Sequence, residues 1–90
     1  MSEKRSKMDI VFDILKAIND KGGTIIPTHL LYKSNLSHQR MNEYLADLMQ
    51  KKLVQESERK GKKVYVLTDE GYKFLNEYRK LKEFTEAFGM

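Results

Sequence analysis

The side chains with the clearest chemical potential lie in the stretch 37–49. Apolar residues recur there at intervals of three and four, at Met41, Tyr44, Leu45, Leu48 and Met49. This spacing predicts an amphipathic helix with one buried stripe. The opposite face carries side chains that can form hydrogen bonds but have no core to join, namely His38, Gln39, Arg40, Asn42 and Glu43. A helix with an apolar back and a hydrogen-bonding front suits the major groove of duplex DNA.

Three of these polar side chains have the donors and acceptors needed to read bases. Arg40 can pair with guanine O6 and N7, and Gln39 or Asn42 can pair with adenine N6 and N7. Ser37 precedes the helix and is a good N-cap, so the backbone N–H groups at Ser37 and His38 would attract a phosphate. We therefore expect this face to combine base contacts with a backbone contact.

Glu43 is the acidic member of this set. A carboxylate repels phosphate unless it accepts a hydrogen bond from a cytosine amine. We expect Glu43 instead to pair along the helix with Arg40 or with a later cation such as Lys51. Glu43 and Asp47 also leave an alternative open, in which this helix face binds another protein.

The sequence offers little for catalysis or metal binding. It contains no cysteine, and its two histidines, His29 and His38, lie on separate predicted helices. The pair Gly22-Gly23 lacks the frame of a phosphate-binding loop. Most of the tyrosines fall on apolar stripes, which favours packing in the core over stacking on bases. We predict no catalytic residue, no metal site and no cofactor.

Periodicity and turn residues predict three elements ahead of this helix, which itself is expected to run over 37–52. They are a helix over 8–20, a short strand over 24–26 and a helix over 28–34. Gly22-Gly23 ends the first helix, Thr28 is the expected N-cap of the second, and Asn35 ends it. Two helices separated by so short a turn form a helix-turn-helix.

A β-hairpin is predicted after the helix. Two β-prone runs, 53–58 and 63–67, flank a turn that contains Gly61. Tyr65 and Leu67 alternate onto one face, which we expect to enter the core. The turn region carries four cations, Arg59, Lys60, Lys62 and Lys63. We expect them to contact phosphates, although lysines at a hairpin also protect an exposed sheet edge.

A long helix is predicted from the N-cap Thr68 to Phe88. Its apolar positions repeat at intervals of four and three, as in a coiled-coil seam. The preceding 67 residues form a body too small to cover a helix of roughly 30 Å, so the end from Tyr78 onward should project. We predict that it binds a second copy through Phe74, Tyr78, Leu81, Phe84, Thr85 and Phe88. The alternative is that the helix folds back on the first helix of its own chain.

Length and charge fit a small protein with a polyanion partner. The 90 residues form one folded unit, which we divide into a flexible basic arm (1–7), a main domain (8–75) and a C-terminal extension (76–90). The net charge is +4, and residues 1–67 hold 13 basic against 8 acidic side chains. This excess suits a polyanion. With no apolar run that could span a membrane and no signal peptide, we expect a cytoplasmic, nucleoid-associated protein.

The order helix, strand, helix, helix, hairpin, helix resembles that of winged helix-turn-helix domains over residues 8–75. The similarity is carried by the tract Met49-Gln50-Lys51-Lys52-Leu53-Val54, by Gly61 and by Tyr65-Val66-Leu67-Thr68-Asp69-Glu70-Gly71. These segments are similar to the family's succession of recognition helix, wing and L-T-x-E-G helix start. The long last helix makes the chain resemble small archaeal winged-helix proteins that dimerise through a C-terminal coiled coil. Those proteins are transcription-regulator-like or chromatin-type DNA binders.

The resemblance implies an α+β fold with a three-helix core and a β-hairpin wing. It also assigns DNA contacts to three groups of residues. The recognition-helix front falls on Ser37, His38, Gln39, Arg40, Asn42 and Glu43, the wing on Arg59, Lys60, Gly61, Lys62 and Lys63, and further phosphate contacts on Thr28 and Lys33. The expected function is a homodimeric transcription regulator that binds double-stranded DNA. The alternatives are an architectural DNA binder and a protein-interaction module.

Overall fold

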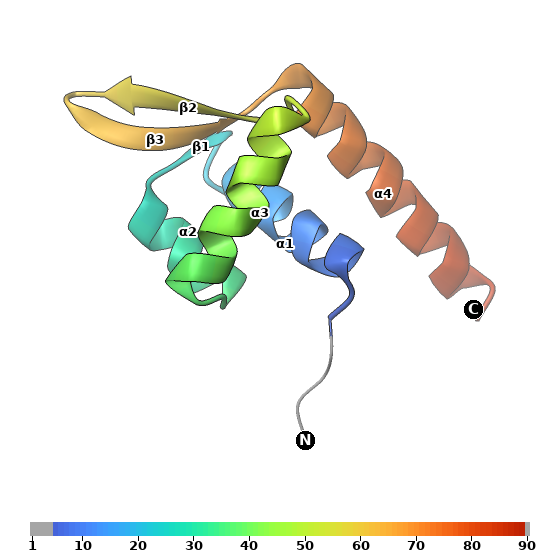
Figure 1. Ribbon diagram of the computed structural model, residues 1–90. Coiled ribbons are helices and arrows are strands. Elements are labelled where there is room, and N and C mark those ends of the chain that lie inside the picture. Colours follow the sequence, from blue (N-terminus) through green and yellow to red (C-terminus); the bar gives the residue numbers. More distant parts are fainter. Residues whose placement is uncertain (1–4, 90) are drawn as a thin grey trace.

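The computed structural model describes residues 5–89 and shows an α+β fold (Figure 1). The elements are α1 (Lys7–Asp20), β1 (Thr24–Ile25), α2 (Pro27–Ser34), α3 (His38–Gln50), β2 (Val54–Arg59), β3 (Lys62–Leu67) and α4 (Asp69–Ala87). This order confirms the predicted fold class. The hairpin β2–β3 and helix α4 extend from opposite sides of the body in Figure 1. None of the helices in the described range has the length and apolar character that a membrane crossing needs.

The N-terminal segment is bound to the body at Arg5. Its guanidinium donates to Asp13 Oδ2 at 2.8 Å and to a backbone carbonyl at the end of α2 at 3.1 Å, where helical carbonyls lack partners. Ser6 caps α1, and Lys7 is its first residue. Arg5, Ser6 and Lys7, expected in a free basic arm, thus belong to the folded body. The rest of that arm, residues 1–4, lies outside the described residues.

The helix-turn-helix is set by local sequence at each boundary. α2 begins at Pro27, whose fixed φ suits the first helical position, so Thr28 lies in the first turn. The prediction that Thr28 caps this helix is therefore wrong. Asn35 adopts the left-handed conformation with φ of 56° and ends α2, as predicted. Ser37 caps α3, as predicted, by accepting a hydrogen bond from the Arg40 backbone N–H.

β3 lies between β1 and β2 in an antiparallel sheet. The register pairs Arg59 with Lys62, so the hairpin turn contains just Lys60 and Gly61, with φ of 53° and 78°. Two successive residues with positive φ are typical of a type I′ turn, whose twist matches that of a hairpin. The turn is therefore tighter than the four-residue tip predicted from the sequence, and strand pairing continues to its base.

The core lies among α1, α2, α3, the sheet and the first half of α4. Its most deeply buried apolar side chains are Ile14, Leu15, Ile18, Leu30, Met41, Leu45, Leu48, Val54 and Leu75. Tyr65 and Leu67 join them from β3, which confirms the predicted alternation of that strand. Because the apolar stripe of α3 is buried here, the rotation of α3 about its own axis is fixed and its polar side faces outward.

The first half of α4 packs on the body. Thr68 caps the helix, and Gly71 is buried so closely against the Leu53 carbonyl that a Cβ atom would collide with it. Further along, Tyr78 packs on Phe12 of α1, with ring centroids 5.2 Å apart. The helix therefore does fold onto α1 of its own chain as far as Tyr78.

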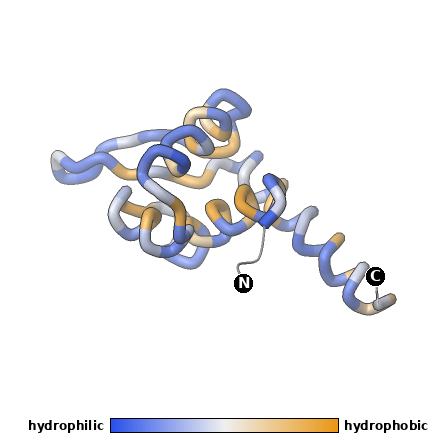
Figure 2. The backbone as a smooth tube through the Cα atoms, turned by 60° about the horizontal axis from the view of Figure 1, so that its bottom comes forward, coloured by the Kyte–Doolittle hydropathy of each residue, from blue (hydrophilic) through white to orange (hydrophobic). Residues whose placement is uncertain are grey.

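The last turns of α4 project from the body, and Figure 2 shows apolar positions on this projecting end. Leu81, Phe84 and Phe88 are 56%, 54% and 65% exposed. The Phe84 and Phe88 rings pack on one another, with centroids 4.7 Å apart. The end of α4 thus presents a small aromatic and aliphatic surface to solvent.

Candidate nucleic-acid interface

α3 turns its polar side to solvent along its whole length. The three residues predicted to read bases, Gln39, Arg40 and Asn42, are all exposed, and so is His38 of the same predicted front. At about 100° of rotation per residue, the middle of the exposed side is a single row, hereafter the outer row, made of Gln39, Glu43, Ala46 and Gln50. His38 and Asn42 flank this row on one side, and Arg40 and Asp47 flank it on the other.

Ala46 and Gln50 belong to the outer row but are absent from the set predicted from the sequence. Both side chains are exposed. They continue the helical spacing that begins at Gln39 and Glu43, so extending that spacing by two further turns would have found them. An alanine methyl can contact a thymine methyl, and a glutamine amide can pair with adenine. The usable face of α3 is therefore about two turns longer than predicted.

Hydrogen bonds along α3 orient two of the predicted side chains. Gln39 Nε2 donates to Glu43 Oε2 at 3.4 Å. Asn42 Nδ2 lies 3.2 Å from His38 Nδ1. Each contact uses an amide N–H and leaves the amide carbonyl oxygen able to accept a hydrogen bond. The exposed face therefore offers fewer free amide donors than its residue types alone indicate.

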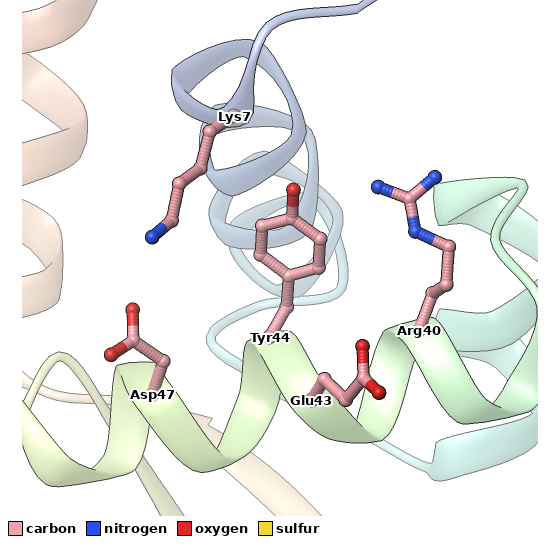
Figure 3. A pocket seen from close by; sticks show the side chains of 5 residues that line it. All are labelled: Lys7, Arg40, Glu43, Tyr44 and Asp47. Atoms are coloured by element: carbon pink, nitrogen blue, oxygen red, sulfur yellow. The ribbon is translucent and has the colours of Figure 1, made fainter.

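A shallow cleft of about 330 Å³ separates α3 from the start of α1 and is lined by Lys7, Arg40, Glu43, Tyr44 and Asp47. Figure 3 shows Lys7 and Asp47 pointing toward one another, and Tyr44 rising from α3 toward α1. The Arg40 guanidinium lies 5.8 Å from the centroid of the Tyr44 ring, within the range of a cation–π contact. This contact holds Arg40 on the flank of the outer row. Within the described part of the chain, no group of three or more ligand side chains is placed to hold a metal ion.

Asp47 binds the lysine that was expected to pair with Glu43. The Lys51 amine lies 2.7 Å from Asp47 Oδ2, and this hydrogen bond is the main cause that holds the pKa of Asp47 below its ordinary value. The prediction that Glu43 pairs with Arg40 or Lys51 is wrong. Among residues 5–89, the ion pairs are Arg5–Asp13, Lys16–Asp20 and Asp47–Lys51.

The four cations of the hairpin do not share one face. Arg59 and Lys62 stand opposite one another in the register and so lie on the same face of the ladder. Lys63 lies on the other face, opposite Glu58, because successive side chains of a strand alternate. Lys60 lies in the turn. One face of the hairpin end is therefore cationic, and the other carries both signs of charge.

The two α2 residues assigned to phosphate contacts are both exposed. Thr28 lies in the first turn of α2. Lys33 lines a shallow cleft together with Asp13, Lys16 and Asp20 of α1. The structure thus places Lys33 beside two carboxylates of α1, each of which already pairs with another cation, Asp13 with Arg5 and Asp20 with Lys16.

The residues predicted for dimerisation divide into two groups. Tyr78 donates a hydrogen bond to Asp9 Oδ1 at 3.0 Å, and Phe74 packs against the core of its own chain. Thr85 is half-buried, and its hydroxyl donates to a carbonyl of α4 itself. The exposed members are Leu81, Phe84 and Phe88. They continue an apolar groove of about 370 Å³ that is lined by Met8, Phe74, Glu77, Tyr78 and Leu81.

The element order and the placement of α3 beside the hairpin agree with a comparison against protein families. The family model described as Winged helix-turn-helix matches residues 4–86. The chain belongs to the winged helix-turn-helix family. In the family's terms, α3 is the recognition helix and the hairpin β2–β3 is the wing. A search of curated proteins finds no match to the chain.

Solved structures of similar fold share little sequence with this winged helix-turn-helix chain. Sso10a-2, a DNA-binding protein from Sulfolobus solfataricus, superposes with a TM-score of 0.72 and 22% identity over 94% of this chain and 90% of that one. F93 from STIV, a winged-helix DNA-binding protein, superposes with a TM-score of 0.75 and 21% identity over 89% of this chain and 92% of that one. At these identities the likeness establishes the fold.

A larger DNA-binding protein contains the same fold as one part of its chain. BpsR of Bordetella bronchiseptica, whose DNA binding is regulated by 6-hydroxynicotinic acid, superposes with a TM-score of 0.76 and 19% identity. The match covers 87% of this chain but 57% of BpsR. The present chain therefore corresponds to little more than half the length of BpsR.

Proposed function

We propose that the protein is a dimeric transcription regulator of the cytoplasm that binds duplex DNA with α3 in the major groove. The observation that carries this proposal is the exposed outer row of α3, which is held outward by a buried apolar stripe and lies beside a cationic wing. A major groove about 12 Å wide admits one α-helix. The wing then lies along the flanking backbone or in the minor groove.

Positive charge around α3 supports a nucleic-acid partner. Arg59 and Lys62 form the cationic face of the wing, with Lys60 at its tip, and Arg40 flanks the outer row. Each phosphate that a lysine or arginine neutralises releases counterions, so such binding weakens steeply with salt. The descriptions of Sso10a-2 and F93 as DNA-binding proteins support the same partner for this chain.

A second copy of the chain is the occupant we assign to the exposed end of α4. The surface formed by Leu81, Phe84 and Phe88 is contiguous with the groove at Met8 and Phe74. It carries mainly apolar groups on a helix that extends beyond the body. A two-fold pair of such helices buries the same surface on both copies. It would also set two recognition helices at a fixed separation, as palindromic half-sites require.

The DNA proposal is tested by fluorescence anisotropy with a labelled duplex at about 50 mM and about 200 mM salt. The wild-type protein should bind, and binding should weaken steeply at the higher salt. The double variant Lys60→Ala/Lys62→Ala should weaken binding to every sequence and make the negative slope of log K against log salt shallower by about 2. The matched control, Lys73→Ala/Lys80→Ala, removes two exposed cations of α4 and should leave that slope close to the wild-type value. Failure of the wild type to bind duplex DNA at the lower salt refutes the proposal.

Selection of bound sequences from a random duplex library separates a regulator from an architectural protein. A regulator should enrich one motif and prefer it on the order of 10³-fold over random DNA. A flat profile, with binding retained, would instead identify an architectural DNA binder.

A further inference from the structure

Glu43 occupies the centre of the outer row, yet among residues 5–89 it has no cationic partner that would give it a structural role. Arg40 is held over the Tyr44 ring, and Lys51 is held by Asp47. Glu43 accepts a hydrogen bond from Gln39 Nε2 instead. A carboxylate in this position faces whatever partner approaches α3 most closely.

The contact between Gln39 and Glu43 determines which groups the row offers to DNA. Gln39 donates one amide N–H to Glu43, and the Gln39 carbonyl oxygen and the Glu43 carboxylate remain able to accept further hydrogen bonds. In the major groove, only the N4 amine of cytosine and the N6 amine of adenine are donors. The O6 of guanine and the O4 of thymine are acceptors and would leave the desolvated carboxylate without a hydrogen bond.

We propose that Glu43, oriented by Gln39, is the specificity-determining residue of α3 and selects an exocyclic amine of cytosine or adenine in the major groove. This inference rests on the proposed DNA binding and names the base chemistry that α3 reads. Two effects act together. The amine is bound by charge-assisted hydrogen bonds, and other DNA is disfavoured because the carboxylate repels phosphate when no amine is within reach. Ala46, one turn further along the row, is small enough to let the helix approach the base edges.

The test compares base preferences of the wild type, Glu43→Gln and Glu58→Gln in a selection from random duplexes. Glu43→Gln keeps the size of the side chain but adds an amide donor, so it tolerates guanine and thymine. Glu58→Gln removes the same charge from the wing and serves as the matched control. Glu43 and Glu58 are both exposed, so neither substitution disturbs the core.

The wild type should enrich cytosine or adenine at one position of each half-site, by on the order of 10-fold over guanine and thymine. Duplexes that carry each of the four bases at that position then show which of the two amines is bound. Glu43→Gln should lose this preference and bind random DNA more tightly than the wild type. Glu58→Gln should keep the preference.

Two results would overturn the inference in different ways. If the wild type binds DNA but Glu43→Gln selects the same motif, or no amine-bearing base is enriched, Glu43 does not read bases and the DNA-binding proposal is unaffected. If the wild type fails to bind any duplex at about 50 mM salt, the proposed function itself is wrong and this inference falls with it.

Discussion

Asp9 and Tyr78 form a contact between two residues that are 69 positions apart in the chain. The Asp9 carboxylate accepts hydrogen bonds from the Ser6 backbone N–H and from the Tyr78 hydroxyl. These bonds, with the Ser6 backbone contributing most, hold the pKa of Asp9 below its ordinary value. Burial, and then the bond to Asp9, raises the pKa of Tyr78. The pair fastens the first turn of α1 to the middle of α4.

Both pKa shifts make stability depend on pH, with opposite signs. The contribution of Asp9 is complete above its unfolded pKa of about 3.9 and is lost as pH falls through the lower folded pKa. The contribution of Tyr78 is complete below its unfolded pKa of about 10 and is lost as pH rises through the higher folded pKa. The contribution of this contact to the free energy of unfolding should therefore be greatest between the unfolded pKa of Asp9 and the unfolded pKa of Tyr78.

Replacement of Tyr78 by phenylalanine should lower the melting temperature at neutral pH and flatten its decline at both acidic and alkaline pH. The ring keeps its packing on Phe12, so the change isolates the hydroxyl. Thermal unfolding followed by circular dichroism from about pH 3 to about pH 11 measures the effect. The control Tyr32→Phe removes a hydroxyl from a side chain that is 86% exposed and should reproduce the wild-type profile. Parallel profiles for Tyr78→Phe and wild type would show that the Asp9 contact contributes nothing in solution.

At the scale of elements, α4 is positioned by a close approach at its first turn. Gly71 lies against the Leu53 carbonyl, in the connection between α3 and β2. The Thr68 hydroxyl donates a hydrogen bond to the same carbonyl at 3.0 Å, and the Thr68 backbone N–H donates a second one to it at 3.2 Å. The helix that projects from the body is therefore anchored beside the end of the recognition helix.

Substitution of Gly71 by alanine should lower the free energy of unfolding by about 1–3 kcal/mol, because the added Cβ atom overpacks this contact. This loss should outweigh the gain of about 1 kcal/mol that alanine ordinarily brings to a helix. Urea unfolding followed by circular dichroism measures the difference. Asn76→Ala, at an exposed position of the same helix, is the control and should be neutral or slightly stabilising. If Gly71→Ala were as stable as the wild type, α4 could move away from Leu53 without cost.

At the scale of the whole molecule, the described chain extends over 47 × 32 × 22 Å, and the hairpin β2–β3 and α4, which extend in different directions from the body, account for its elongated shape in Figures 1 and 2. A monomer of this shape leaves Leu81, Phe84 and Phe88 in water. Burial of apolar area stabilises association by about 25 cal/mol per Å² before the costs of association are subtracted. The proposed dimer removes that exposure.

The double variant Leu81→Glu/Phe88→Glu should convert a dimer into a monomer, because each copy would bring two carboxylates into an apolar interface. Static light scattering at micromolar concentration measures the mass. The control, Asn76→Glu/Ala87→Glu, adds the same two carboxylates at exposed positions on the other side of α4 and should remain dimeric. A wild type that is already monomeric under these conditions rules out this dimer.

The sequence by itself determined the elements and the side that each one buries. The stripe of α3 and the alternation at Tyr65 and Leu67 depend on local backbone geometry, in which every third or fourth residue of a helix and every second residue of a strand share a face. The caps at Ser37 and Thr68 and the left-handed Asn35 are likewise local. The predicted recognition residues are exposed because they lie on the side of α3 opposite its buried apolar stripe. The dimer and the DNA contacts are still predictions.

Only the tertiary structure decided which side chains engage one another. Asp9 binds Tyr78, and Arg5 binds Asp13 and the end of α2, across separations in the chain that periodicity cannot connect. Tertiary placement also brought Gly71 against the Leu53 carbonyl. Contacts within α3 are local, but several partners were available there to each charge at helical spacing, and side-chain geometry selected Tyr44 for Arg40 and Asp47 for Lys51. Because Arg40 and Lys51 are both bound by other side chains, Glu43 remains facing outward. Which of several possible pairs forms depends on the distances between the side chains, and helical spacing alone does not specify these distances.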